Sequence, residues 1–175
     1  MHVLQRIAIQ ADDKDHAFRA VKDTLERELG NNEYSTNTWY DWFVTGGGRW
    51  NTNDKDGYDD NDQSMTISYD EEPEKFIEAV NEGIEARVSE FNTYRKYFNE
   101  KNVDINAYLD KYDGQMDFSM ELYDLSKMID MIHGKWDFNS YFYDMHHDST
   151  NTMHMLRSLD KGDKNWYIVF VDFHF

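Results

Sequence analysis

The most informative segment for the fold is Trp166-Tyr-Ile-Val-Phe-Val-Asp-Phe-His-Phe175. Aromatic and β-branched side chains dominate it, and these residue types favour an extended strand over a helix. Because apolar residues follow one another almost without a break, the pattern predicts a central strand that is covered on both faces of a sheet. Asp172 and His174 are its polar members, and their spacing of two places them on one face of the strand.

At the other end of the chain, residues 2–10 alternate between apolar and polar side chains, which predicts a second strand. A helix is expected over residues 13–29, and either Asp12 or Asp13 would cap its first turn. The apolar residues of this helix recur at intervals of three and four: Phe18, Val21, Leu25 and Leu29.

The middle of the chain is expected to hold two further strands and then several helices. Residues 38–45 are rich in aromatic and β-branched side chains, and residues 64–69 have the character of a short return strand. Pro73 stands where the first turn of a helix tolerates proline, and an apolar stripe extends that helix to about residue 99. Shorter helices are predicted near 104–112 and 119–133, and another strand at 141–143.

This order of elements predicts an α+β fold that resembles a ferredoxin-like sandwich, β-α-β-β-(inserted helices)-β. A single proline and the absence of a Gly/Ser-rich linker give no sign of a domain boundary. We therefore expect one domain over residues 1–175, with an acidic loop at 51–63 and a helical insertion at 74–133.

Charge is the strongest signal in the composition. The 175 residues include 35 acidic and 18 basic side chains, for a formal net charge of −17. A field of this sign repels a phosphate backbone, so we expect no binding to duplex nucleic acid. The absence of cysteine excludes disulfides, thiol nucleophiles and Cys-based zinc sites. No apolar run has the length of a membrane span and no signal peptide is recognised, so we expect a cytoplasmic protein without membrane contact.

The segment Trp39-Tyr-Asp-Trp-Phe-Val-Thr-Gly-Gly-Gly-Arg-Trp50 is the most unusual in the chain. Glycines let backbone N–H groups approach an anion, arginine binds a phosphate or carboxylate, and tryptophan stacks on a base. The combination favours a pocket for a small anionic ligand or nucleotide, although its spacing fits neither a P-loop nor a dinucleotide fingerprint. The alternative is a β-bulge whose glycines make room for bulky neighbours. The candidate ligand-binding residues are Trp42, Gly46, Gly47, Gly48, Arg49 and Trp50.

This run resembles a W-D-W-x-x-G-G-R-W-like motif of uncharacterised small proteins from phages and bacteria. Those proteins also begin with a strand and a helix, and they often end in an apolar strand that carries D-x-H, as Asp172 and His174 do here. The present chain differs in its third glycine and its longer acidic loop. The resemblance implies no particular activity, but it favours a phage origin.

Residues 54–74 carry nine acidic side chains and a single basic one, Lys55. An EF-hand is excluded, because a loop with Gly57 at the sixth position would need charged ligands where Thr52 and Gln63 stand. The carboxylates would then form a solvated loop, a loose site for divalent ions, or a surface for a basic partner. The candidate partner-binding residues are Asp54, Asp56, Asp59, Asp60 and Asp62.

Histidines gather in the C-terminal part of the chain: His133, His146, His147, His154 and His174. Such side chains can hold zinc or iron, but no HExxH or His-x-His spacing supports a metal site. No nucleophile elbow supports a serine triad either. The sequence therefore assigns no catalytic residue, no metal ligand and no cofactor, and we do not expect an enzyme.

Two functions remain. The first is a small acidic, phage-encoded binding protein that inhibits a host defence or nucleic-acid-acting protein, because carboxylates on a compact surface can mimic the charge of a nucleic acid. The alternative is a sponge or hydrolase for a nucleotide signal, centred on the Gly46–Trp50 segment. The expected partner is accordingly the basic surface of a host protein or a small anionic ligand.

Overall fold

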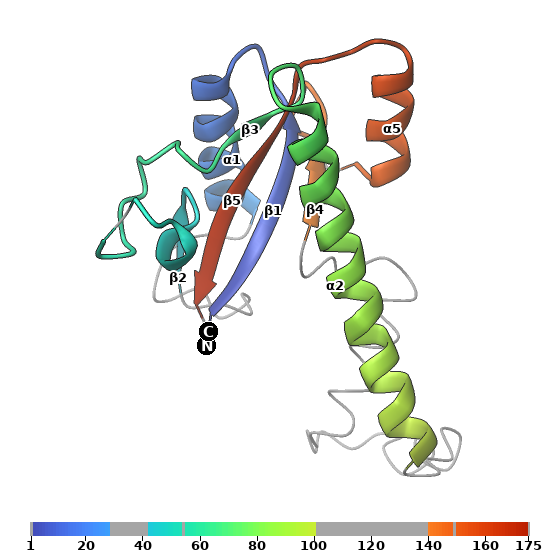
Figure 1. Cartoon of the computed structure of the whole chain (residues 1–175). Helices are drawn as coiled ribbons and strands as arrows, with labels where there is room; N and C mark the ends of the chain where they lie inside the picture. Colours follow the sequence, from blue (N-terminus) through green and yellow to red (C-terminus); the bar gives the residue numbers. More distant parts are fainter. Residues whose placement is uncertain (1, 29–41, 54, 101–139, 149, 175) are drawn as a thin grey trace. The chain divides into compact units, whose positions relative to one another are not determined.

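The computed structural model describes residues 2–28, 42–53, 55–100, 140–148 and 150–174 (Figure 1). The expected mixture of helices and strands is confirmed, while the helices predicted at 104–112 and 119–133 and residues 38–41 lie outside the described residues. The chain divides into two compact units, residues 1–84 with 139–175, and residues 85–138. The elements are β1 (His2–Gln10), α1 (Lys14–Glu28), β2 (Trp42–Thr45), the 3-10 turn η1 (Gly48–Trp50), β3 (Ile67–Ser68), α2 (Pro73–Glu100), β4 (Ser140–Tyr143), α5 (Thr152–Asp160) and β5 (Trp166–His174).

β1 and β5 lie side by side at the centre of the sheet, as Figure 1 shows. The strand order is β2-β5-β1-β4, and β1 pairs antiparallel with β5 from His2 opposite His174 to Gln10 opposite Trp166. β4 joins the other side of β1 in parallel. The predicted central position of β5 is confirmed. Its continuous apolar run fits a strand whose two faces both enter a core.

β2 and β3 lie one after the other along the same side of β5. β2 pairs with residues 171–174 of β5 and β3 with residues 167–168, both antiparallel. The return strand predicted at 64–69 is therefore limited to Ile67–Ser68, and it forms no hairpin with β2. β2 and β3 are instead two parts of one edge strand, and the segment 46–66 between them leaves the sheet and returns to it. The ferredoxin-like topology is accordingly not confirmed.

Helices cover both faces of the sheet. Successive residues of a strand point to opposite faces, so β5 contributes Val169 and Val171 to one core and Ile168 and Phe170 to the other. On the first face α1 packs over the sheet through Ala17, Phe18, Ala20, Val21 and Leu25. On the opposite face the start of α2 and α5 cover the sheet through Phe76, Ala79, Val80, Met155 and Leu159.

Local signals explain where the helices begin. Oδ1 of Asp13 accepts a hydrogen bond from the N–H of His16 at 2.7 Å, so Asp13 caps α1. Pro73 is the first residue of α2, as predicted. The sequence pattern did not predict α5, although Asn151 caps it by accepting from the N–H of His154 at 3.0 Å. Within the described residues, no helix combines the length and the apolar character that crossing a membrane requires.

Candidate functional site

Three rings form a row across the end of the sheet where β1 begins and β5 ends. Figure 1 shows these two strand ends side by side. The register places Trp42 of β2 opposite His174 of β5, and His174 opposite His2 of β1. Because residues opposite one another share a face of the sheet, the three rings pack together. Trp42 and His174 are stacked, with ring centroids 4.9 Å apart and 12° between the planes. His2 meets His174 edge-on, with ring centroids 4.7 Å apart.

A buried carboxylate holds the His2 ring. Asp172 lies two residues before His174 on the same face of β5, and it is 0% exposed. Nδ1 of His2 lies 2.9 Å from Oδ1 and 3.1 Å from Oδ2 of Asp172. Since an ionised carboxylate only accepts hydrogen bonds, Nδ1 is the donor, and Nε2 is then the nitrogen without a proton in the neutral ring. The pair therefore fixes both the orientation and the tautomer of His2.

The triple glycine brings the chain against this carboxylate. Gly46, Gly47 and Gly48 have φ angles of 99°, 90° and 49°, the left-handed region that favours glycine. A Cβ atom on Gly48 would lie 2.6 Å from Oδ2 of Asp172, a distance that real Cβ atoms do not reach. The N–H of Arg49 donates to the same oxygen at 3.3 Å. The glycine turn thus completes the surroundings of Asp172.

Four backbone N–H groups of this turn are engaged within the protein. The N–H of Arg49 binds Asp172, and the other three donate to backbone carbonyl oxygens at 2.8–3.0 Å. These N–H groups are therefore not free to cradle an anion, which favours the close-packing interpretation of the glycines over the anion-cradle interpretation. The four residues are Gly46, Arg49, Trp50 and Asn51.

The side chains around the turn are more open than its backbone. Trp50 is 38% exposed, and its ring centroid lies 6.2 Å from that of His2. Tyr58 is 67% exposed and lies 5.6 Å from Trp42, again between ring centroids. The guanidinium of Arg49 is exposed and forms no ion pair with any described residue. We call the group formed by His2, Trp42, Trp50, Asp172 and His174 the aromatic–histidine centre.

The acidic loop is held in place by its own carboxylates. Asp62 accepts hydrogen bonds from the N–H of Ser64 and from Nδ2 of Asn51, both at 2.8 Å. The bond from the Ser64 backbone lowers the pKa of Asp62 below its ordinary value. A Cβ on Gly46 would lie 2.3 Å from the carbonyl oxygen of Asp62, so the loop packs directly on the glycine turn.

Two more of the predicted partner-binding aspartates have contacts within the protein. Asp60 forms an ion pair with Lys22 of α1 at 2.5 Å, and Oδ1 of Asp59 accepts from the N–H of Asn61 at 3.0 Å. Asp56 is exposed, and Asp54 lies outside the described residues. The loop therefore contributes negative charge and is also held to the rest of the protein by specific contacts.

A second pair of histidines lies beyond the other end of β1. His147 follows β4 in a turn at a φ of 59°, and its ring centroid is 5.7 Å from that of His16 in the first turn of α1. Burial lowers the pKa of His147, and the charges of His16 and Arg27 lower it further. Nε2 of His147 is buried, and no described residue forms a hydrogen bond with it.

The other predicted histidines form no shared site. His146 and His154 are exposed, and His133 lies outside the described residues. Across the part of the chain that the structure describes, no three His, Cys, Asp or Glu side chains gather closely enough to hold a metal ion. Only His174 of the predicted group belongs to the aromatic–histidine centre.

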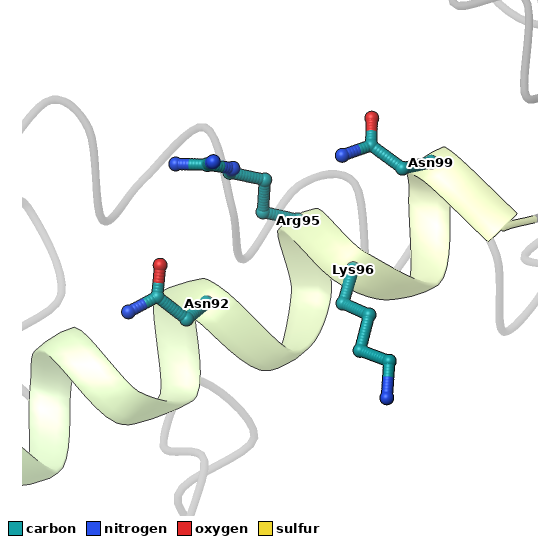
Figure 2. Close-up of a pocket in the computed structure, with 4 residues that line it drawn as sticks. All are labelled: Asn92, Arg95, Lys96 and Asn99. Carbon is teal, nitrogen blue, oxygen red and sulfur yellow. The ribbon is translucent and has the colours of Figure 1, made fainter.

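In the second unit, the last turns of α2 line a cavity of about 340 Å³. Figure 2 shows Asn92, Arg95 and Asn99 projecting from one side of the helix and Lys96 from another. Amide and cationic groups suit a polar guest, but all four residues come from one helix. We therefore place the candidate site at the aromatic–histidine centre, where four separate elements, β1, β2, η1 and β5, contribute side chains.

His2 is the member of this centre that sequence reasoning missed. Asp172, His174 and the tryptophans were singled out in separate motifs, and nothing in their spacing links them to the second residue of the chain. The available signal was the prediction of strands at 2–10 and 166–175. An antiparallel pairing of these two strands from end to end brings His2 opposite His174.

Comparison with known proteins found no matching family model, no matching curated protein and no matching solved structure. The resemblance to small phage and bacterial proteins therefore stays a prediction. The case for a function depends on the geometry of the chain itself.

Proposed function

We propose that the aromatic–histidine centre binds a planar anionic ligand of the nucleotide class. One observation carries the proposal: the rings of Trp42 and Trp50 lie beside a histidine that a buried carboxylate holds in place. The neighbouring guanidinium of Arg49 is exposed and forms no ion pair with a described residue. The rings of Trp50 and Tyr58 suit stacking on a base. The guanidinium of Arg49 suits the oxygens of a phosphate.

The net charge of the chain opposes such a ligand at long range. A formal charge of −17 repels an anion, whereas Arg49 and the rings act only at contact. Salt screens the long-range repulsion more than the contacts. We therefore expect nucleotide affinity to hold or to rise when salt increases from about 0.05 M to about 0.5 M.

Isothermal titration calorimetry on the full chain tests this proposal with adenine and guanine nucleoside monophosphates and with a dinucleotide. Loss of one stacking ring in Trp50→Ala should weaken binding about tenfold. Arg49→Ala should weaken it as well, while Arg157→Ala removes an equally exposed arginine from α5 and serves as the matched control. No heat of binding with any of these probes at millimolar concentration would reject the proposal.

A second candidate is a binding protein whose acidic surface blocks a basic host protein, such as one that acts on nucleic acid. The specific observation in its favour is the chain's excess of carboxylates, several of which are exposed without an ion pair to a described residue. They stand at the start of α2 and just before it rather than in the loop: Glu71, Glu74 and Glu78. We place either function in the cytoplasm, that of the host if the chain is viral.

Salt separates the two candidates. The chain should displace a labelled DNA duplex from a basic DNA-binding protein at about 0.05 M salt and lose this ability at about 0.5 M. Combining Glu71→Gln, Glu74→Gln and Glu78→Gln should slow association and flatten the salt response. Displacement that ignores salt, or a triple variant that associates as fast as the wild type, would reject the second candidate.

A further inference from the structure

We propose that His2 is a general base, and that the aromatic–histidine centre hydrolyses a phosphodiester bond of its nucleotide ligand. This inference rests on the proposed nucleotide binding and adds a reaction to it. Its starting point is the pair formed by His2 and the fully buried Asp172, whose oxygens lie 2.9 and 3.1 Å from Nδ1.

The cost of burying Asp172 indicates that the pair is more than packing. A buried carboxylate loses the hydration of its charge and is stable only when donors replace that water. Two donors are present here, the Nδ1–H of His2 and the N–H of Arg49. The turn reaches Asp172 only because Gly48 has no Cβ, which would stand 2.6 Å from the carboxylate. This arrangement holds the imidazole of His2 in one orientation.

The second nitrogen of that imidazole suits a base. Nδ1 is occupied by Asp172, so proton transfer falls to Nε2, which is unprotonated in the neutral ring. The His2 side chain is 13% exposed, which leaves the ring in contact with solvent while Asp172 is shielded from it. A histidine base held by a buried carboxylate is an arrangement that acid–base catalysis uses repeatedly.

The reaction balances without a further reactant. Water gives one proton to Nε2 of His2, and its oxygen forms a bond to phosphorus. The phosphorus–oxygen bond to the leaving alcohol breaks, the alkoxide takes a proton from solvent, and His2 returns its proton to solvent. The products are a phosphate monoester and an alcohol. Arg49 would neutralise charge on the non-bridging oxygens as the new bond forms.

Asp172 is a positioning residue in this scheme. It does not reach the substrate, because it lies beneath the ring and is 0% exposed. Its role is to keep the proton on Nδ1, and an amide in its place can also donate a hydrogen bond and so release the tautomer. Asp172→Asn should therefore change the pH–rate profile as well as the rate, which a merely structural loss would not do.

The experiment measures hydrolysis of bis(4-nitrophenyl) phosphate and of a 3′,5′-linked dinucleotide by the full chain. His2→Asn is the informative variant, since the asparagine amide can still donate to Asp172 but cannot act as a base. We expect it to lose about a hundredfold or more of the rate while staying folded, with a melting temperature close to that of the wild type. His146→Asn, an exposed histidine in the turn after β4, is the matched control and should keep the full rate.

The outcomes separate this inference from the proposed binding. Nucleotide binding with no hydrolysis above background, or equal rates for the wild type and His2→Asn, would overturn the general base and leave the binding in place. Hydrolysis of the diester that depends on His2, without measurable nucleotide binding, would support the base and reject the nucleotide as its ligand. A contaminating hydrolase would give the same rate in every variant, which also counts against the inference.

Discussion

The two histidine pairs at opposite ends of β1 have opposite electrostatic surroundings. At the start of the strand, His2 donates to the buried carboxylate of Asp172. Beyond its end, His147 lies near another histidine, and Nε2 of its ring is buried without a hydrogen-bond partner among the described residues. The backbones differ as well, because glycine occupies the left-handed position beside Asp172, whereas His147 itself adopts a φ of 59°. The comparison shows that partners, rather than residue type, decide what a histidine can do.

The largest effect is expected where the glycine turn meets Asp172. Gly48→Ala places a Cβ 2.6 Å from the Asp172 carboxylate at a φ of 49°, and it should destabilise the chain by about 3 kcal/mol through overpacking and strain. Gly162 also has a left-handed φ, of 93°, but nothing lies within 4 Å of its Cβ position. Gly162→Ala should cost only about 1 kcal/mol. Chemical denaturation of both variants measures the difference, and equal losses would mean that the contact with Asp172 does not matter.

The next prediction separates two contributions of His2 to stability, the hydrogen bond that it donates to Asp172 and the packing of its ring. His2→Ala leaves the buried Asp172 without its side-chain donor and should cost about 2 kcal/mol. His2→Asn keeps a donor at the same distance along the side chain and should recover most of that loss. The free energies of unfolding in urea provide the measurement. An equally large loss in both variants would show that ring packing, not the hydrogen bond, holds the centre together.

A third prediction concerns the sheet between the two pairs. Gln5 of β1 is 0% exposed, and neither its amide nitrogen nor its amide oxygen has a hydrogen-bond partner among the described residues. Gln5→Met keeps the volume and removes the unpaired polar atoms, so it should stabilise the chain by about 1 kcal/mol. A rise in the melting temperature would confirm it. A fall would mean that the amide is satisfied by bound water, as buried polar groups commonly are.

The sequence predicted individual strands and helices well, but it predicted poorly which of them pair with one another. The apolar run of β5, the alternation in β1 and the capping aspartate of α1 are local signals, and the structure confirms all three. The return strand expected at 64–69 is shorter in the structure and pairs with β5 rather than with β2, and no local pattern in the sequence indicates which strand will be its partner.

The candidate site was predicted in part. Trp42 and Trp50 were selected for their chemistry, and both rings lie beside the ring of His2. Of the two roles considered for the glycines, close packing agrees with the contact of Gly48 and Asp172, while anion binding stays a prediction. His2 and Asp172 are 170 positions apart, so their contact depends on strand register, which the sequence does not specify alone.

The smallest effect is the pH dependence of the second pair. Burial, His16 and Arg27 lower the pKa of His147 in the folded chain below the ordinary 6.5, against the opposing charges of Asp144 and Asp23. The unfolded chain then binds a proton more readily, so this contribution to stability is complete above about pH 6.5 and is lost as the pH falls below it. His147→Asn removes the titration and tolerates the left-handed backbone. Denaturation between pH 8 and 5.5 should show a flatter profile for the variant, and parallel profiles would contradict the assignment.

One measurement tests the central claim most directly: nitrogen-15 NMR of the histidine rings, which identifies the nitrogen that carries the proton in each neutral imidazole. The account predicts that His2 of the wild-type chain holds its proton on Nδ1, with Nε2 unprotonated, and that Asp172→Asn abolishes this preference. If His2 instead carries its proton on Nε2, or averages between both tautomers as a free histidine does, Asp172 does not orient the ring. The aromatic–histidine centre would then lose its base.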